Sequence, residues 1–444
     1  MSRLVVSNQL PEEIVDGPLA VSDDYRSYLG TQSHRMVWCA RPGDIVVLPT
    51  SPDPAYLAYV GSHLGMSPAD LRVVVPPTGA QGDDLLYDDR LAHPAFVEDL
   101  RSAIRAAGVD EIYPFYYDRA ALTLAEELGL HSVDDGLGFF VQGGVDLVNS
   151  KATFRALAAG NRVNLPPGAV VNDPEAAEAA IWELLSHKET VIVKQDIHGG
   201  GIGNEVITRE PDVNAFGADS VVVVEDRAAL AAHLTTSWQR YSANGRRAVV
   251  IEQYIHDCTP VYAEFVIGEG DRRLLGHGEM RMKPIINGLV VPGPTAELAS
   301  YGAFLDSCAR LAAAVQAMGY RGNISFDAMA TPEGQILFNE CNGRVGGSTH
   351  IHRIGTDVVG ADYATTKVLV ERRRCSWPSF TEALEALREA GIAYDRKTAT
   401  GVLITVDDAW PGGPSGQCLI VGPTRRDALA TEELLVQALD AIAR

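Results

Sequence analysis

The segment 322–348 (GNISFDAMATPEGQILFNECNGRVGGS) constrains the fold more than any other part of this chain. Two runs of alternating apolar and polar residues flank residues 332–335 (PEGQ), and a Glu-Gly pair between such runs is typical of a β-hairpin. If this pair forms a two-residue turn, Asp327 lies directly opposite Glu340. Asn342 then points to the same face, because strand side chains alternate. The hairpin therefore brings two carboxylates and one amide together.

Two carboxylates directly opposite each other destabilise a sheet by roughly 0.2–1 kcal/mol. The arrangement becomes favourable when a hard divalent cation lies between them, and magnesium prefers such oxygen ligands. Met329, Ile336 and Phe338 are expected on the same face, which indicates that this face is covered. The alternative is a solvated outer face with an accidental acidic pair.

The residues after the hairpin favour an anion-binding site. Arg344 follows Asn342 by two positions and is placed to brace a transferring phosphoryl group. Gly343, Gly346 and Gly347 allow backbone amides to approach an anion closely. A lone surface arginine is the alternative interpretation of Arg344.

Composition and charge exclude several classes of protein. With a formal net charge of −21, the chain repels phosphate backbones, so we expect no nucleic-acid partner. No run of about 18 apolar residues is present and no secretory signal is visible, so we expect no membrane segment. Six scattered cysteines without a Cys-x-x-Cys pair indicate reduced thiols and a cytoplasmic location. The run 372–374 (RRR) is expected to be solvated surface, and His350 and His352 have no obvious third metal ligand.

The order of apolar runs predicts three domains in these 444 residues. Residues 1–146 alternate short strands (44–49, 71–76, 111–115) with helices (55–64, 95–107), which favours a parallel sheet. Residues 147–372 contain antiparallel strands and an amphipathic helix at 301–318, which Gly319 ends. Residues 373–444 form a small tail. The fold class is therefore α/β.

Two lysines lie where phosphates are commonly bound. Lys151 follows Asn149-Ser150, both good helix N-cap residues. A phosphate bound at this helix N-terminus would also contact the lysine. Lys194 ends an apolar strand and precedes the glycine-rich loop 198–204 (HGGGIGN), which matches neither the Walker nor the dinucleotide pattern. The strand end 252–255 (EQYI) can offer backbone groups to a purine edge.

Taken in order, these segments resemble the ATP-grasp superfamily over roughly residues 147–370. Residues 1–145 resemble the domain that precedes the grasp in many of these enzymes. The resemblance implies an ATP-grasp fold with an N-terminal parallel-sheet domain and a small C-terminal extension. It also implies that the chain uses ATP and Mg²⁺.

The resemblance implies a role for each matching residue. The phosphate contacts would be Lys151 and Lys194, and the loop closing over them would include Gly199, Gly200, Gly201 and Gly203. Adenine would meet Glu252, Gln253, Tyr254 and Ile255, and the ribose would meet Glu264. Magnesium would be held by Asp327, Glu340 and Asn342. The cations of the reaction would be Arg344 with Arg281 or Lys283, and the substrate groove would include Gly347, Ser348 and His350.

One departure bears on the substrate. Some members carry an arginine two residues before the first metal carboxylate, where this chain has Ser325. A D-alanine–D-alanine ligase is therefore disfavoured. The overall amino-acid sequence, including the C-terminal tail, looks most like the peptide ligases of pheganomycin-type biosynthesis. That likeness implies an acyl phosphate on a modified amino acid, an amine acceptor at the end of a peptide, a role in antibiotic biosynthesis and, by analogy, a homodimer.

Two alternatives stay open. A phosphotransferase on the same fold shares the metal site and makes a phosphorylated product in place of an amide. A nucleotide-binding module without turnover is disfavoured, because mere binding has less need of all three candidate metal ligands. The sequence does not identify the donor acid or the acceptor.

Overall fold

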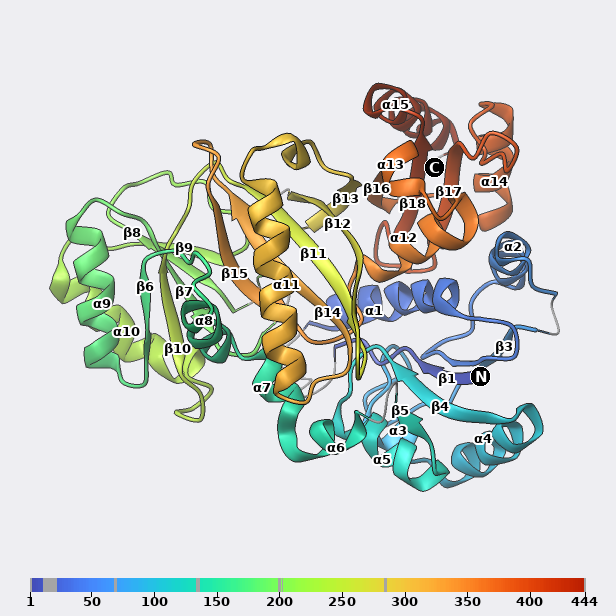
Figure 1. Cartoon of the computed structure of the whole chain (residues 1–444), viewed down its shortest axis with the longest axis horizontal. Helices are drawn as coiled ribbons and strands as arrows, with labels where there is room; N and C mark the ends of the chain where they lie inside the picture. Colours follow the sequence, from blue (N-terminus) through green and yellow to red (C-terminus); the bar gives the residue numbers. More distant parts are fainter. Residues whose placement is uncertain are drawn as a thin grey trace.

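The computed structural model describes residues 2–10, 22–67, 70–132, 136–198, 201, 203–282 and 286–442. Figure 1 shows three groups of elements: an N-terminal part in blue, a lobe in green, and a long sheet that runs into the C-terminal part. No helix among the described residues is long and apolar enough to cross a membrane.

The N-terminal part contains a five-stranded sheet in the order β3-β2-β1-β4-β5, with every neighbouring pair parallel. The strands and helices predicted for this region are confirmed. In α4, Phe96, Leu100 and Ile104 form the buried stripe, and Gly108 ends the helix with a left-handed conformation. The elements are β1 (Ser2–Val6), α1 (Asp23–Gln32), η2 (Ser33–Cys39), β2 (Ile45–Val47), α2 (Pro54–Leu64), β3 (Arg72–Val74), α3 (Asp88–Leu91), α4 (Pro94–Ala107), β4 (Val109–Pro114), α5 (Arg119–Leu128) and β5 (His131–Ser132).

Short helices connect this part to the rest of the chain. They are α6 (Leu137–Phe139), η4 (Phe140–Gly144), α7 (Val145–Asn149) and α8 (Lys151–Gly160). Gly138, Gly143 and Gly144 lie within these helices, and Gly143, at φ +84°, produces a kink.

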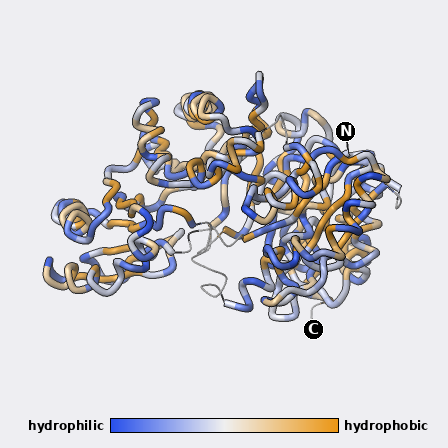
Figure 2. The backbone as a smooth tube through the Cα atoms, turned by 90° about the horizontal axis from the view of Figure 1, so that it is seen from below, coloured by the Kyte–Doolittle hydropathy of each residue, from blue (hydrophilic) through white to orange (hydrophobic). Residues whose placement is uncertain are grey.

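A small lobe, defined here as residues 168–253, contains a sheet in the order β6-β10-β7-β8-β9. α9 and α10 pack on it around Ile181, Leu230 and Ile251, in a hydrophobic core separate from the main one. Figure 2, viewed from below, shows this lobe projecting to the left of the larger body. The elements are β6 (Gly168–Val171), α9 (Pro174–Ser186), β7 (Val191–Gln195), β8 (Glu205–Thr208), β9 (Ser220–Val223), α10 (Arg227–Tyr241) and β10 (Val249–Gln253).

The large sheet has eight strands in the order β15-β14-β11-β12-β13-β16-β18-β17. α11 covers one face with the predicted stripe of Phe304, Cys308, Leu311 and Val315. The elements are β11 (Thr259–Ile267), β12 (Arg272–Met282), β13 (Ile286–Val291), η5 (Pro294–Glu297), α11 (Tyr301–Ala317), β14 (Gly322–Ala330), β15 (Ile336–Asn342), α12 (Thr349–Ile354), η6 (Gly355–Val359), α13 (Tyr363–Thr366), β16 (Val368–Cys375), α14 (Phe380–Glu389), β17 (Gly401–Val406), β18 (Gly416–Gly422) and α15 (Arg425–Ile442).

The C-terminal part continues the large sheet. The predicted boundary at 372/373 falls inside β16, which pairs with β13 on one side and β18 on the other. The indole of Trp38 and the hydroxyl of Tyr56 both donate to the Thr405 carbonyl, at 3.0 and 2.7 Å, so the N-terminal part is bound to β17. One continuous core joins the N-terminal part, the large sheet and the tail.

Candidate active site

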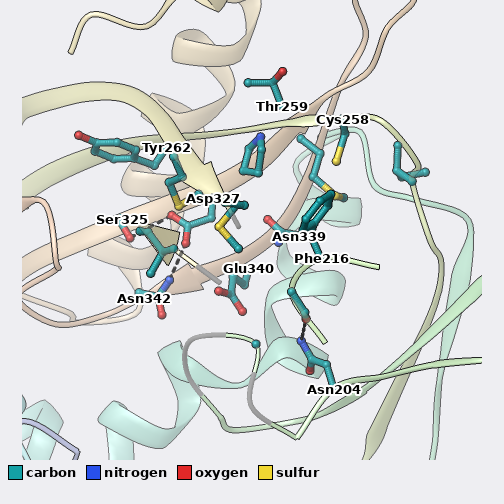
Figure 3. Close-up of a pocket in the computed structure, with 18 of the residues that line it drawn as sticks. Asn204, Phe216, Cys258, Thr259, Tyr262, Ser325, Asp327, Asn339, Glu340 and Asn342 are labelled. Atoms are coloured by element: carbon teal, nitrogen blue, oxygen red, sulfur yellow. Dashed lines mark hydrogen bonds between the residues drawn. The ribbon is translucent and has the colours of Figure 1, made fainter. Parts of the chain in front are cut away.

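A cavity of about 510 Å³ lies between the small lobe and one face of the large sheet. Its polar wall includes Lys194 from β7 and the candidate metal ligands from β14 and β15, as Figure 3 shows for the latter. Met280, Met282 and Met329 give it an apolar wall on the large sheet. A cavity with apolar walls and a few grouped charges is the usual form of a small-molecule site.

The predicted pairing of Asp327 with Glu340 is confirmed, although the turn is not the predicted one. The Thr331 amide donates to the Gln335 carbonyl at 2.8 Å, so the loop has three residues and ends at Gly334, whose φ is +82°. This longer loop moves the register by one.

A bulge restores the register before the acidic pair. Ala328 pairs with Phe338 and Asp327 with Glu340, so Asn339 is the extra residue on β15. Asn339 and Glu340 both line the cavity.

The prediction that Ile336 and Phe338 share the acidic face is wrong. Phe338 packs against Phe304 of α11, with ring centroids 5.4 Å apart, on the opposite face of the sheet. Ile336 lies two residues before Phe338 and is buried in the same core. Met329 lines the cavity as predicted.

Neighbouring charges give the two buried carboxylates different proton affinities. Burial, together with the charge of Glu340, raises the pKa of Asp327 to about 7. Burial acts in the same direction on Glu340, but Lys151, Lys194 and Arg344 outweigh it and lower its pKa. Asp327 is therefore the carboxylate that most needs a further cation.

Hydrogen bonds fix the orientation of the candidate metal ligands. The Asn342 amide nitrogen donates to Asp327 at 2.9 Å, and Ser325 donates to Asp327 at 3.2 Å. Arg344 donates to the Asn342 amide oxygen at 2.9 Å. Among the described residues no group of three or more His, Cys, Asp and Glu side chains is arranged so that it could hold a metal ion. Two carboxylates and one amide oxygen nevertheless fit Mg²⁺, which usually completes its octahedron with water and phosphate oxygens.

Lys151 lies next to this polar wall, in a small adjoining pocket that Glu340, Asn342 and Arg344 also line. Ser150 caps α8 as predicted, accepting from the Thr153 amide. The Lys151 ammonium donates to the His198 carbonyl at 2.6 Å and lies 3.4 Å from a Glu340 oxygen. The lysine thus joins the helix N-terminus, the loop after β7 and the acidic pair.

Lys194 is held by a buried carboxylate. Glu252 accepts from the Lys194 ammonium and from Arg155 of α8, both at 2.5 Å. The Glu252 carboxylate is therefore occupied by two cations, and its side chain positions Lys194 in the cavity wall.

The segment after β10 forms one end of the cavity. The Gln253 amide donates to Glu189 at 2.5 Å, and the Tyr254 hydroxyl accepts from the Phe216 amide at 2.7 Å. Ile255 lines the cavity with them. Because these polar side chains have protein partners, adenine recognition would depend on the backbone and on apolar contact.

Part of the predicted glycine loop can be placed. Gly201 lines the cavity, and the Gly203 amide donates to Asp219 at 2.5 Å. A side chain at Gly201 would collide with the backbone of Gly217, and φ is +82° there. Gly199 and Gly200 lie outside the described residues.

The predicted ribose role of Glu264 does not agree with its surroundings. Its side chain is fully buried and accepts from Asn323 at 3.0 Å, from Ser348 at 2.6 Å and from Thr349. Glu264 anchors the loop before α12 and does not line the cavity.

The predicted catalytic role of Arg281 also does not agree with the structure. Its guanidinium binds both carboxylate oxygens of Glu432 in α15, at 2.7 and 3.2 Å. Met280 and Met282 line the cavity, so alternation turns Arg281 to the opposite face of β12. Lys283 lies outside the described residues.

The predicted substrate residues separate into two groups. Gly347 and Ser348 line the cavity. His350 is buried behind this wall, with one ring nitrogen 3.9 Å from Glu371. Burial, together with the charges of Arg35 and Arg373, keeps the pKa of His350 well below its usual range.

Sequence reasoning missed Arg373. The run 372–374 was expected at the surface, yet Arg373 is only 8% exposed and lines the cavity. Arg372 binds Glu432 at 3.3 Å, and Arg374 lies over the Tyr28 ring. If residues 368–375 had been recognised as a strand, alternation would have placed Arg373 on one face and its two neighbours on the other.

Comparisons with known proteins agree with this architecture. Residues 33–130 match the Pre ATP-grasp domain family, and residues 382–435 match the PGM1 C-terminal domain family. No curated protein sequence gives a significant match.

Solved structures resemble the whole chain. Biotin carboxylase from Campylobacter jejuni aligns over 99% of this chain and 91% of its own, with a TM-score of 0.60 and 14% identity. The biotin carboxylase domain of Hydrogenobacter thermophilus 2-oxoglutarate carboxylase, solved with MgADP, ADP and bicarbonate, aligns over 98% and 89%, with a TM-score of 0.58 and 13% identity. N5-carboxyaminoimidazole synthetase from Staphylococcus aureus aligns over 99% and 97%, with a TM-score of 0.53 and 11% identity.

The chain therefore has the ATP-grasp fold, with an N-terminal pre-grasp domain. The small lobe and the large sheet are the two halves of the grasp, and the cavity lies between them.

Proposed function

We propose that this protein is a magnesium-dependent ligase that activates a carboxylate with ATP as an acyl phosphate and joins it to an amine. The observation that carries the proposal is the pairing of Asp327 with Glu340 at the wall of a cavity that Arg344 also lines, with the Lys151 ammonium 3.4 Å from Glu340. This arrangement places carboxylates that can hold Mg²⁺ beside cations that can stabilise a transferring phosphoryl group.

The nucleotide would lie along the cavity. Ile255 and the adjoining backbone contact the adenine, and Met280 and Met282 cover its opposite face. Lys194, held by Glu252, and Lys151 contact the phosphates. The described glycines of the loop, Gly201 and Gly203, exclude water from them.

Asp327, Glu340 and Asn342 would hold Mg²⁺, which when bound neutralises charge on the phosphate oxygens. Arg344 stabilises the phosphoryl group as it passes to the substrate carboxylate. The amine then attacks the acyl carbon, and phosphate leaves. No enzyme nucleophile is needed.

The finer proposal concerns the substrates. The overall likeness to peptide ligases of pheganomycin-type biosynthesis supports a modified amino acid as donor and the amino end of a peptide as acceptor. A homodimer and a cytoplasmic location remain predictions, and a size measurement in solution tests the former.

ADP release with Mg²⁺ and mixed amino acids and short peptides, with and without hydroxylamine, tests the proposal. Carboxylate-dependent ADP release with hydroxamate formation is expected, because hydroxylamine traps an acyl phosphate. A phosphorylated product inert to hydroxylamine would instead indicate a phosphotransferase. A rate of ADP release that no added carboxylate changes would contradict the ligase proposal.

A further inference from the structure

Two buried arginines from distant parts of the chain meet behind Gly347. Arg35 lies in η2 of the N-terminal part, and Arg373 lies in β16. A methyl group placed on Gly347 would lie 3.4 Å from an Arg35 guanidinium nitrogen and 3.3 Å from one of Arg373. Gly347 and Arg373 line the cavity, and Arg35 lies directly behind Gly347.

Both guanidinium groups are held in place. Arg35 donates to the Gln32 carbonyl at 2.8 Å and to the Gln9 side chain at 3.3 Å. Arg373 lies 3.0 Å from Glu371 and donates to the Gly347 carbonyl at 3.3 Å. The buried Nε atom of Arg373 has no hydrogen-bond partner among the described residues.

The local charge is positive. Arg35 and Arg373 face one close carboxylate, Glu371, and the buried His350 stays neutral. The nearby Arg344 interacts with Asp327 and Glu340. Burial, with the charge of Arg373, lowers the pKa of Arg35 to about 10. Buried cations without matching anions are costly, and an anionic ligand offsets that cost.

We infer that Arg35 and Arg373 bind the carboxylate of the donor substrate next to Arg344. The inference rests on the proposed function and deepens it. Before phosphoryl transfer, a donor carboxylate must approach the γ-phosphate, and these two anions repel each other. Cations on the carboxylate side offset that repulsion and orient the attacking oxygen. Gly347 leaves room for the carboxylate between the guanidinium groups.

Hydroxamate formation from MgATP, mixed amino acids and hydroxylamine tests the inference, because that reaction needs the donor but no peptide. Arg35→Lys and Arg373→Lys should each raise the KM for the amino-acid mixture about 30-fold or more, since lysine cannot reproduce the planar fork. Binding of a fluorescent ATP analogue should change less than about twofold. The matched controls, Arg41→Lys and Arg374→Lys, should leave the KM unchanged.

Gly347→Ala provides a second variant that keeps both charges. Its methyl group would occupy the space between the guanidinium groups, so the same KM increase is expected at an unchanged Tm. Unchanged hydroxamate formation in all three site variants, with loss of peptide coupling alone, would show that the arginines serve the acceptor and overturn the inference.

A binding measurement separates this inference from the proposed function. N-acetylglycine, but not its neutral amide, should raise the Tm of the wild-type protein, and Arg373→Lys and Gly347→Ala should lose this shift. A carboxylate-specific shift without any hydroxamate would support the subsite while contradicting the ligase. No shift and no carboxylate-dependent turnover in the wild type would overturn the subsite.

Discussion

At the scale of single residues, the acidic pair is where a minimal change should have the largest effect on turnover. Glu340→Gln keeps the size of the side chain but removes the charge next to Lys151. We expect kcat for carboxylate-dependent ADP release to fall at least about 1,000-fold, because a metal-assisted transfer loses a ligand. Circular dichroism should be unchanged. Glu333→Gln, in the exposed turn of the same hairpin, is the control, and near-normal turnover in Glu340→Gln would rule out the metal assignment.

Glu252 should affect both stability and nucleotide binding. Its carboxylate is 1% exposed and bound by Lys194 and Arg155, so Glu252→Gln leaves two buried cations poorly compensated. Breaking a buried pair costs about 3–5 kcal/mol. We expect a comparable loss in urea unfolding and an increased KM for ATP. Glu178→Gln, which removes the carboxylate partner of the exposed Arg227, should change neither by more than a small amount. Full stability of Glu252→Gln would contradict the positioning role.

At the scale of elements, alternation along β12 makes neighbouring residues act differently. Met280 lines the cavity, whereas Arg281 binds Glu432 on the other face. Met280→Glu should therefore weaken ATP binding strongly, because it places a negative charge beside the nucleotide site. Arg281→Met should leave kcat unchanged and lower stability by roughly 0.5–1 kcal/mol, since the pair is partly exposed. Steady-state kinetics and urea unfolding of both variants check this. A large loss of kcat in Arg281→Met would restore its catalytic role.

The hairpin shows how far local sequence reasoning reaches. The facing of Asp327 and Glu340 was predicted from alternation and a two-residue turn. The real loop has three residues, and the bulge at Asn339 restores the register, so two errors cancelled. Turn length and bulges depend on packing against α11, where Phe338 is buried, and that contact is not local in sequence.

The same limit applies to Arg281, Glu264 and Arg373. Their residue types fit a nucleotide site, but their roles depend on partners far away in the chain. Arg281 is bound by a residue of α15, and Glu264 by the loop before α12. Arg373 reaches the cavity because β16 joins the large sheet, which no pattern around residues 372–374 indicates. Ordered motifs thus predicted the fold and the pairing of Asp327 with Glu340, whereas the surroundings of Arg281, Glu264 and Arg373 depend on long-range pairing.

At the scale of the whole molecule, the predicted three-domain division understates how the parts interlock. The small lobe has its own core, but the N-terminal part, the large sheet and the tail share one. Gln32 of α1 donates to the Ser415 carbonyl at 2.9 Å, directly before β18. The proposed donor site contains residues from both ends of this shared body. The tail therefore belongs to the body that carries the site, whereas the small lobe packs around a core of its own.

Buried neutral histidines should make this shared body sensitive to acid. Burial lowers the pKa of His34 to about 4 and that of His352 to about 3, whereas an unfolded histidine titrates near 6.5. Below pH 6.5 the unfolded chain binds protons that the folded chain does not, so stability falls as pH falls. Each such group contributes about 1.4 kcal/mol per pH unit. Asp327, whose pKa is raised to about 7, acts in the opposite direction, so a comparison of variants is needed.

His34→Gln isolates one contribution, because glutamine can still bond to Thr50 but does not titrate. Between pH 6.5 and 5, urea unfolding should show that the wild type loses roughly 2 kcal/mol more stability than the variant does. His187→Gln changes an exposed histidine at the C-cap of α9; it is the control and should follow the wild type. Parallel pH dependence of His34→Gln and the wild type would mean that His34 is protonated in the folded protein. Other titrating groups would then cause the loss of stability in acid.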